Sequence, residues 1–354
     1  MKTKIYFLFI LTFLITLKSF YSQNIRPIRD NVGFCWDSEE MKNFIQYLDS
    51  IYEGTKQDKE NLIAAISVHD DYLYAGKVYY PLFKLINAKE VIIFGVTHGT
   101  VRKEVNPPTE VLILDNFDSW KGIYNDVKIS PLREIIKLKL DKKYFMVNNK
   151  AHEVEHSIEA LIPFLQFYNP NVKITPIMVT QMSVGKMEEI SLQLSKIITD
   201  YIKTNKLKLG KDIFILISND ANHYGEDFNN SPYGLDLNAH QKGIENDQRI
   251  INEYLIGIVE PERIKNLAKE ILPDETNLKI IPLWCGRYPI IFGLFTLNKI
   301  ANNLGIKNIE GKLIKYSDTF TEKVLPFRKS SMGLTAPFSL KHWVGFFTLG
   351  FYIK

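Results

Sequence analysis

Short runs of apolar residues recur along the chain, and each is followed by polar, loop-like sequence. The runs are rich in β-branched residues and have the length of strands that are buried on both faces of a sheet. Four of them share this form: residues 62–68, 91–96, 172–179 and 213–218. The apolar stretch over residues 342–352 predicts a further strand in the same sheet.

Segments with helical periodicity lie between these runs, over residues 39–52, 184–204, 240–258 and 286–302. Alternating strands and helices predict an α/β fold with a central, mostly parallel or mixed sheet flanked by helices. The sequence shows no internal repeat, low-complexity tract or linker rich in proline and glycine. We therefore expect residues 23–354 to form a single domain.

Residues 1–22 have a different composition from the rest of the chain. Two lysines precede an apolar run from Ile5 to Leu17, and small or polar residues follow as far as Ser22. The run is too short to span a bilayer, and the whole pattern is typical of a signal peptide. We predict export to the periplasm or the medium after cleavage. An uncleaved N-terminal membrane anchor is the alternative.

The charge of the chain gives no sign of a polyanionic partner. The formal net charge is +4, and residues 1–22 contain three lysines and no acid, so the mature chain carries +1. No run of lysine and arginine is interleaved with aromatic residues. A nucleic-acid partner is therefore not predicted, and neither is a membrane partner after cleavage. We expect a small-molecule or peptide ligand of unspecified identity.

Histidines follow three of the predicted strands. His69, His98 and His223 each come shortly after an apolar run, and Asp220 shares the loop of His223. Ligands of open α/β sheets bind beyond the carboxyl ends of the strands. One histidine in such a place is ordinarily a loop residue bonded to the backbone, but three indicate a shared cleft. Because imidazole is a ligand of zinc, copper, iron and nickel, the sequence predicts a metal site.

A separate signal is the H-E-x-x-H formed by His152, Glu153 and His156, which is the zinc signature of many metallopeptidases. On a continuous helix over residues 151–165, both histidines would lie roughly 150° from the middle of the apolar stripe and point away from the core. Asn148 or Asn149 can cap that helix, and Pro163 would interrupt or kink it.

The extended metallopeptidase pattern is absent. Glu159 stands at its glycine position and Ile162 at its third histidine. We therefore interpret the match as an accident and keep an exported zinc peptidase as an alternative function.

Five segments, in this order, resemble the motifs of the Memo family, also called AmmeMemoRadiSam system protein B. They are VHDDYLYAG (68–76), GVTHGT (95–100), EHSIEALIPFLQ (155–166), SNDANHYGEDF (218–228) and CGRYPI (285–290). In the third segment the resemblance begins at Glu155, so His152 lies outside the motif.

The resemblance implies a fold like that of class III extradiol dioxygenases, with a metal at the end of the sheet. It implies His69, His98 and Cys285 as the metal ligands, with His223 and Asp220 in the same pocket. Iron or copper is the metal that it implies, and zinc is also compatible because a thiolate softens the site towards Cu(I) or zinc.

Three residues have predicted roles beyond metal binding. His223 would exchange protons with a substrate or with a ligand of the metal, and Asp220 would orient His223. Arg287 would meet an anionic group of the substrate. The predicted function is an exported Memo-like metalloprotein of the non-haem iron or copper redox type. A binding module that holds a peptide or small ligand without turnover is a further alternative.

The chain departs from the family pattern at several positions. Asp70 and Asp71 add two carboxylates beside His69, and we expect them to be solvated loop residues. Cys35 stands where the family usually has a pocket aromatic. A disulfide between Cys35 and Cys285 would remove the predicted thiolate ligand, so it is an alternative to the metal site.

Overall fold

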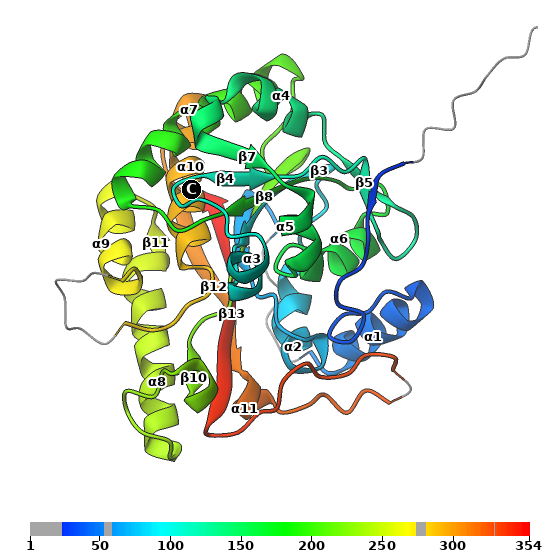
Figure 1. The fold of residues 1–354 in the computed structure, drawn as a ribbon, viewed down its shortest axis with the longest axis vertical. Helices are drawn as coiled ribbons and strands as arrows, with labels where there is room; N and C mark the ends of the chain where they lie inside the picture. Colours follow the sequence, from blue (N-terminus) through cyan, green and yellow to red (C-terminus); the bar gives the residue numbers. More distant parts are fainter. Residues whose placement is uncertain (1–22, 53–58, 274–280, 329) are drawn as a thin grey trace, which may run out of the picture.

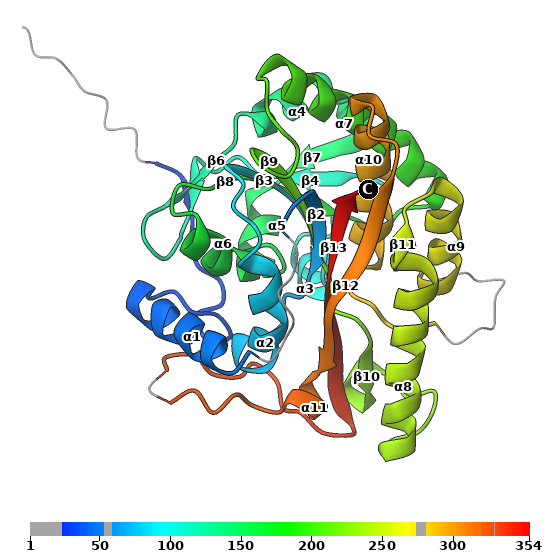
Figure 2. The same cartoon turned by 180° about the vertical axis from the view of Figure 1, so that it is seen from behind.

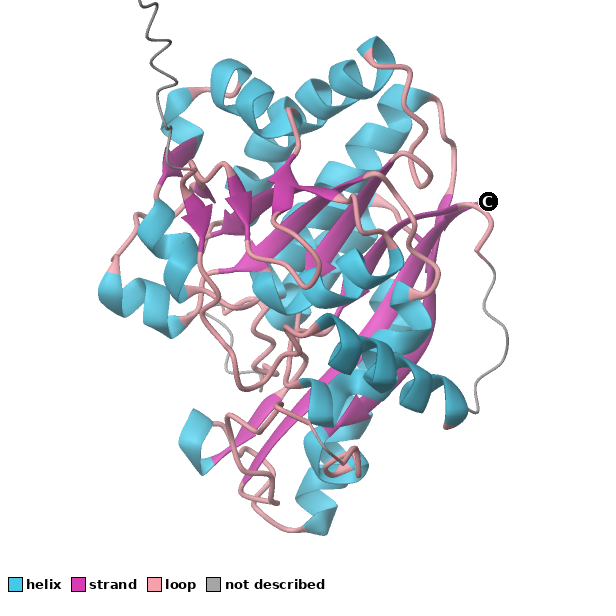
Figure 3. Ribbon diagram, turned by 90° about the vertical axis from the view of Figure 1, so that its right-hand side faces the viewer, coloured by secondary structure: helices cyan, strands magenta, loops and turns pink. Residues whose placement is uncertain are grey.

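The computed structural model describes residues 23–52, 59–273, 281–328 and 330–354. The predicted signal peptide, residues 1–22, lies outside the described residues. Within these ranges, a mixed sheet runs through the molecule and helices cover it, as Figures 1 and 3 show. This confirms the predicted α/β class. That residues 23–354 form one domain stays a prediction. None of the helices in the described ranges has both the length and the hydropathy of a membrane span.

The strands vary from two to twelve residues in length. They are β1 (Ile25–Arg26), β2 (Leu62–Ser67), β3 (Glu90–Val96), β4 (Leu112–Leu114), β5 (Ser119–Trp120), β6 (Val127–Ile129), β7 (Phe145–Val147), β8 (Lys173–Val179), β9 (Ile213–Ser218), β10 (His223–Gly225), β11 (Gly257–Ile258), β12 (Ile309–Asp318) and β13 (His342–Ile353). All five predicted strands are present, within one residue of their predicted limits.

The helices lie mainly between these strands. They are α1 (Ser38–Ser50), α2 (Tyr72–Phe83), α3 (Gly99–Glu104), α4 (Leu132–Lys139), α5 (Asn149–Val154), α6 (Ile162–Tyr168), α7 (Val184–Thr204), α8 (Leu237–Ile250), α9 (Pro261–Ile271), α10 (Arg287–Leu304) and α11 (Thr319–Glu322). Short 3-10 turns are η1 (Lys142–Tyr144), η2 (Glu159–Leu161) and η3 (Glu226–Phe228), and η4 (Ile251–Leu255) is a π-helical continuation of α8.

Hydrogen-bonded neighbours in the sheet follow the order β1-β5-β6-β8-β3-β9-β2-β13-β12-β11. The four strands β8, β3, β9 and β2 are parallel. Strand β13 runs antiparallel to β2 on one side and to β12 on the other. The strand predicted over residues 342–352 is β13, which therefore lies inside the sheet. Figure 2 shows it in red beside β2.

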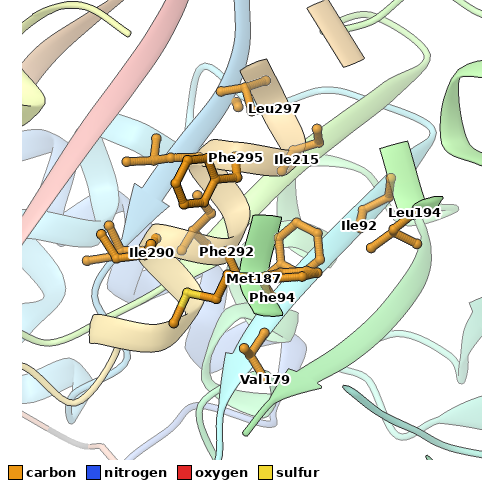
Figure 4. Packing of buried hydrophobic residues seen from close by; sticks show 14 of the residues in the cluster. Ile92, Phe94, Val179, Met187, Leu194, Ile215, Ile290, Phe292, Phe295 and Leu297 are labelled. Atoms are coloured by element: carbon orange, nitrogen blue, oxygen red, sulfur yellow. The ribbon is translucent and has the colours of Figure 1, made fainter. Parts of the chain in front are cut away.

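Both faces of the parallel strands are buried, which explains why their sequences are continuously apolar. Side chains alternate between the faces, so Ile213, Ile215 and Ile217 of β9 pack into one core while Phe214 and Leu216 pack into the other. Figure 4 shows the first core, in which residues of β3 and β9 meet helices α7 and α10. Helices α1, α2 and α6 contribute to the second core.

Two predicted helices are wrong in extent. The helix predicted over residues 240–258 ends in a π-helical turn at Leu255, and β11 follows it. The segment 151–165 is divided into α5, η2 and α6, because Glu155 has extended backbone angles (φ −101°, ψ 137°). Asn148 caps α5 as predicted, with its side chain accepting the N–H of Ala151. Pro163 lies in the first turn of α6, where a proline is tolerated.

Candidate metal centre

The loops that follow three adjacent parallel strands meet at one edge of the sheet. Strand β9 lies between β2 and β3, and the three strands are followed by His69, Asp220 and His98. The rings of His69 and His98 are 5.2 Å apart between centroids. The strand-end pattern thus located a real cluster of side chains.

His69 is held in one orientation by a chain of two serines. Its Nδ1 lies 2.7 Å from the Ser218 hydroxyl, which itself donates to the Ser157 carbonyl at 2.7 Å. Because the hydroxyl proton is used in this way, Ser218 accepts from Nδ1–H of His69. The lone pair is then on Nε2, which lies 3.3 Å from the Cys285 sulfur. Burial, followed by the neighbouring His98 and His156, lowers the pKa of His69 well below its ordinary value.

His98 is oriented by the buried carboxylate of Glu155. Its Nδ1 lies 2.8 Å from Glu155 Oε1, and its backbone N–H donates to Oε2 at 3.0 Å. Burial opposes ionisation of Glu155, but His98 holds the pKa of that carboxyl well below its usual range. Burial alone would lower the pKa of His98, but the charge of Glu155 outweighs burial, so the net effect is a raised pKa. As in His69, Nε2 is the nitrogen left for a ligand.

Cys285 reaches the cluster from the loop before α10. The N–H of Asp220 donates to its sulfur at 3.1 Å, and its own N–H donates to the Asp220 carbonyl at 3.2 Å. Burial, with the charge of Asp220, raises the pKa of the Cys285 thiol well above its ordinary value. Its thiolate form therefore needs a cation beside it, which a bound metal supplies.

The ligand atoms of His69, His98 and Cys285 all lie within 4.8 Å of one another. Two overlapping sets of described residues meet the same limit: His98, Glu155 and His156, and Asp220, His223 and Cys285. The group of His69, His98 and Cys285 offers two imidazoles and a thiol as donors. Each of these side chains also contacts another residue that fixes its direction. These residues fit a single transition-metal or zinc ion.

Asp220 contacts His69 and not the ring of His223. Its Oδ1 accepts the backbone N–H of His69 at 2.9 Å, and its Oδ2 lies 3.4 Å from His69 Nε2. Burial raises the pKa of Asp220 to about 7. The ring of His223 is oriented by the Ala221 carbonyl, 3.1 Å from Nδ1. Among the described residues no hydrogen bond joins Asp220 to that ring, so the predicted orienting role of Asp220 towards His223 stays a prediction.

His223 and Arg287 both line a cavity beside the cluster, together with His98 and Cys285. Burial lowers the pKa of His223 to about 4, so the ring is neutral at pH 7. With Nδ1–H donated to Ala221, its Nε2 is a proton acceptor.

The sequence comparisons agree with this arrangement. A family model described as Memo-like protein matches residues 33–331. The chain belongs to the Memo-like family. Among similar proteins, a MEMO1 family protein of Saccharolobus solfataricus is 29% identical over 216 residues, which are 59% of this chain and 67% of that protein. A MEMO1 family protein of Sulfurisphaera tokodaii is 29% identical over 205 residues, with 56% and 62% covered. One of Saccharolobus islandicus is 30% identical over 218 residues, with 59% and 67% covered. The matched region thus spans 62 to 67% of these relatives.

In this Memo-like chain the two histidines of H-E-x-x-H face different surroundings. His152 is fully buried, and its Nε2 lies 3.1 Å from the Ile113 carbonyl. The prediction that His152 points away from the core is therefore wrong. Because α5 ends before Glu155, His156 turns towards the cluster and stacks on His98 at 4.7 Å. His152 is in none of the candidate metal groups found among the described residues.

His156, Glu155, Ser157 and Ser218 were not predicted as site residues. Burial and the adjacent His98 lower the pKa of His156 to about 3, so it is neutral at pH 7. Glu155, His156 and Ser157 lie in the segment that resembles a Memo motif, and that resemblance was the signal that could have indicated them.

The two cysteines are free thiols in different surroundings. Cys35 is buried in the second core, and burial raises its pKa to about 12. The structure does not contain the disulfide that we considered. Asp71 is also buried rather than solvated, and both of its carboxylate oxygens accept hydrogen bonds from Thr335.

Proposed function

We propose that this Memo-like protein is an exported metalloprotein in which His69, His98 and Cys285 bind one metal ion. The observation that supports this most directly is the convergence of their three ligand atoms within 4.8 Å. Both imidazoles engage a partner through Nδ1, which leaves Nε2 for the metal. Export rests on the signal-like composition of residues 1–22.

Iron or copper is the proposed metal, and either would supply one-electron redox chemistry to the centre. The thiolate of Cys285 favours Cu(I) or zinc over harder ions, so zinc is the competing occupant. The metal content of the protein decides between them.

The remaining side chains would serve a substrate. Neutral His223 can take a proton at Nε2 from a group bound in the cavity that it lines. Arg287 lines the same cavity and can bind an anionic group. Asp220 holds the His69 backbone and so helps to fix the position of a ligand.

The zinc-peptidase alternative is disfavoured by the break after α5. Two histidines of H-E-x-x-H bind one zinc ion when they share a helical face. Here His152 is buried against the Ile113 carbonyl, and His156 follows a residue with extended backbone angles.

The test is the metal content of the mature chain, purified without chelator or histidine tag. We expect near-stoichiometric iron or copper that is lost in His69→Ala and Cys285→Ser but kept in His152→Gln. Zinc that is lost only in His152→Gln would support the peptidase. A protein that binds none of these metals would support the binding module. N-terminal sequencing of protein recovered from the periplasm or medium tests export and cleavage.

A further inference from the structure

Two cavities adjoin the candidate metal ligands. One has a volume of about 280 Å³ and is lined by His98 and Cys285. The other has a volume of about 290 Å³ and is lined by His69 and His156. His223 and Phe228 line both, so these two side chains form a shared wall. A ligand of the metal centre can therefore approach from either of two spaces.

The two cavities carry opposite charge. The first contains two guanidinium groups, from Arg102 and Arg287, and no carboxylate among its described lining residues. The second contains four carboxyl groups and a single guanidinium, which belong to Asp30, Asp70, Asp71, Asp220 and Arg29. A cleft lined by charge of one sign concentrates ligands of the other sign. Burial raises the pKa of Asp70 and Asp220, so the second cavity is less negative than its four carboxyl groups suggest, but an organic anion still finds more positive partners in the first.

The guanidinium groups of the first cavity are not neutralised by the described part of the protein. Arg102 donates through Nη1 to the Thr97 carbonyl at 2.5 Å, which leaves its other donors available. Arg287 lies over the ring of Tyr288, 5.5 Å from its centroid. Neither arginine takes part in an ion pair between described residues. A carboxylate would supply the missing counter-charge and accept two hydrogen bonds from one guanidinium.

The same cavity has an apolar wall. Its partly exposed apolar side chains are those of Leu283, Phe228 and Tyr288, and buried apolar residues such as Val96 and Val179 lie behind them. Its volume is near the lower end of ligand-binding pockets, which typically begin at about 300 Å³. Arg287 also begins helix α10, which has 18 residues, so the positive end of that helix dipole lies at the cavity. The lining thus combines one anion-binding side with an apolar side.

We propose that this cavity binds a small organic acid, with its carboxylate on Arg287 and Arg102 and its apolar body against Leu283 and Phe228. The ligand lies beside His98 and Cys285, so this proposal rests on the proposed function for the role of the ligand. Its binding, however, depends only on the cavity.

Phenylacetate is a suitable probe, with phenylacetamide as its neutral counterpart and phenethylamine as its cationic one. Binding is measured by isothermal titration calorimetry on the mature chain, once without metal and once after loading with Co(II). We expect phenylacetate to bind and both counterparts to bind at least tenfold more weakly. Arg287→Met and Arg102→Met should each weaken phenylacetate binding by roughly tenfold, the effect of one lost charge-assisted hydrogen bond. Arg287→Lys should retain part of the affinity.

Two variants serve as matched controls, because each removes one positive charge outside the first cavity. Arg29 lines the second cavity, and Lys103 is exposed on α3 beside Arg102. Arg29→Met and Lys103→Met should leave phenylacetate affinity within twofold of the parent. Loss of binding in Arg29→Met would overturn the proposal, as would equal binding of phenylacetamide or absence of phenylacetate binding. Phenylacetate binding by a chain that takes up no metal would support this cavity assignment while refuting the proposed metal function.

Discussion

The carboxylate of Glu155 holds His98 at two points, accepting its backbone N–H at 3.0 Å and contacting its Nδ1 at 2.8 Å. The same carboxylate accepts the N–H groups of His156 and Ser157, each at 2.9 Å. Its oxygens are therefore engaged by the protein, and Glu155 is a positioning residue for the imidazole of His98. A carboxylate in this position raises the basicity of a metal-binding histidine and fixes its ring.

Replacing this carboxylate should weaken the proposed metal site without removing a ligand. We expect Glu155→Gln to lower metal affinity by about 10- to 100-fold, the usual effect of losing such a partner. Competition with a chelator of known affinity measures the change. Glu153→Gln is the matched control, since Glu153 is the glutamate of H-E-x-x-H and contributes to none of the candidate metal groups. Loss of metal in Glu153→Gln, with metal retained in Glu155→Gln, would contradict the assignment.

A second buried carboxylate, that of Asp247, supports the loop that contains Cys285. Asp247 accepts the indole N–H of Trp284 at 2.7 Å and the hydroxyl of Tyr316 at 2.9 Å, and Trp284 directly precedes Cys285. Asp247→Ala would leave buried donors without an acceptor, which costs about 1–3 kcal/mol for each group. We expect the free energy of unfolding to fall by roughly 2–5 kcal/mol and the metal affinity to fall with it.

Urea unfolding measures the stability of this variant, and chelator competition measures its metal affinity. Asp200→Ala removes an exposed acid from α7 and should change the free energy of unfolding by about 0.5 kcal/mol or less. A normal metal affinity in Asp247→Ala would show that Trp284 does not position Cys285.

Gly286 is required by close packing between the cysteine loop and the end of β9. A β-carbon at this position would lie 2.5 Å from the Ser218 carbonyl oxygen and 2.6 Å from the Asn219 β-carbon. Gly286→Ala should therefore displace Cys285 and lower the free energy of unfolding by about 1–3 kcal/mol. Thermal unfolding and metal content test this expectation. Gly185→Ala is the control, because a β-carbon there would meet nothing within 4 Å. Equal thermal stability and equal metal content in Gly286→Ala and Gly185→Ala would refute the packing argument.

His152 should make stability depend on pH. Burial lowers its pKa, and its Nδ1 has no hydrogen-bond partner among the described residues, so protonation would place a charge in the core without a partner there. The unfolded chain binds this proton below about pH 6.5, whereas the folded chain does not. The contribution of His152 to stability is therefore present above about pH 6.5 and is lost as the pH falls towards its folded pKa.

The measurement is urea unfolding of the parent and of His152→Gln at several pH values between about 7.5 and 5.5. Each proton that only the unfolded state binds contributes a slope of about 1.4 kcal/mol per pH unit. We expect a shallower loss of stability in the variant, with part of the slope remaining because His156 and His223 also have lowered pKa values. Parallel profiles for the two proteins would show that His152 does not titrate on unfolding.

The sheet and the place of the site could be predicted because both follow from local sequence. Buried parallel strands are continuously apolar, and their carboxyl ends meet at one edge, so His69, His98 and His223 could be grouped without a structure. Cys285 follows none of the predicted strands, and only the resemblance to Memo motifs indicated it. Its approach to Asp220 is a contact between distant segments, which no local pattern encodes.

The break in the segment 151–165 could not be predicted from periodicity. Its apolar residues keep helical spacing although the backbone becomes extended at Glu155. A tertiary contact stabilises the break, because the Glu155 side chain accepts a hydrogen bond from His98, which belongs to another loop. Because the break separates α5 from the helix that follows, the apolar stripe of residues 151–165 also gave no guide to the burial of His152.

Strand β13 determines when the centre can assemble during folding. It pairs with β2, which leads to His69 and precedes β13 by most of the length of the chain. It also pairs with β10, which begins at His223, more than a hundred residues before β13. Contacts between such distant segments slow folding, because a large loop must close before they form. Until residues 342–353 pair with β2, one edge of the parallel strands stays open to pairing with other chains. If the proposed function is correct, the metal ligands reach their final positions only after β13 has joined the sheet.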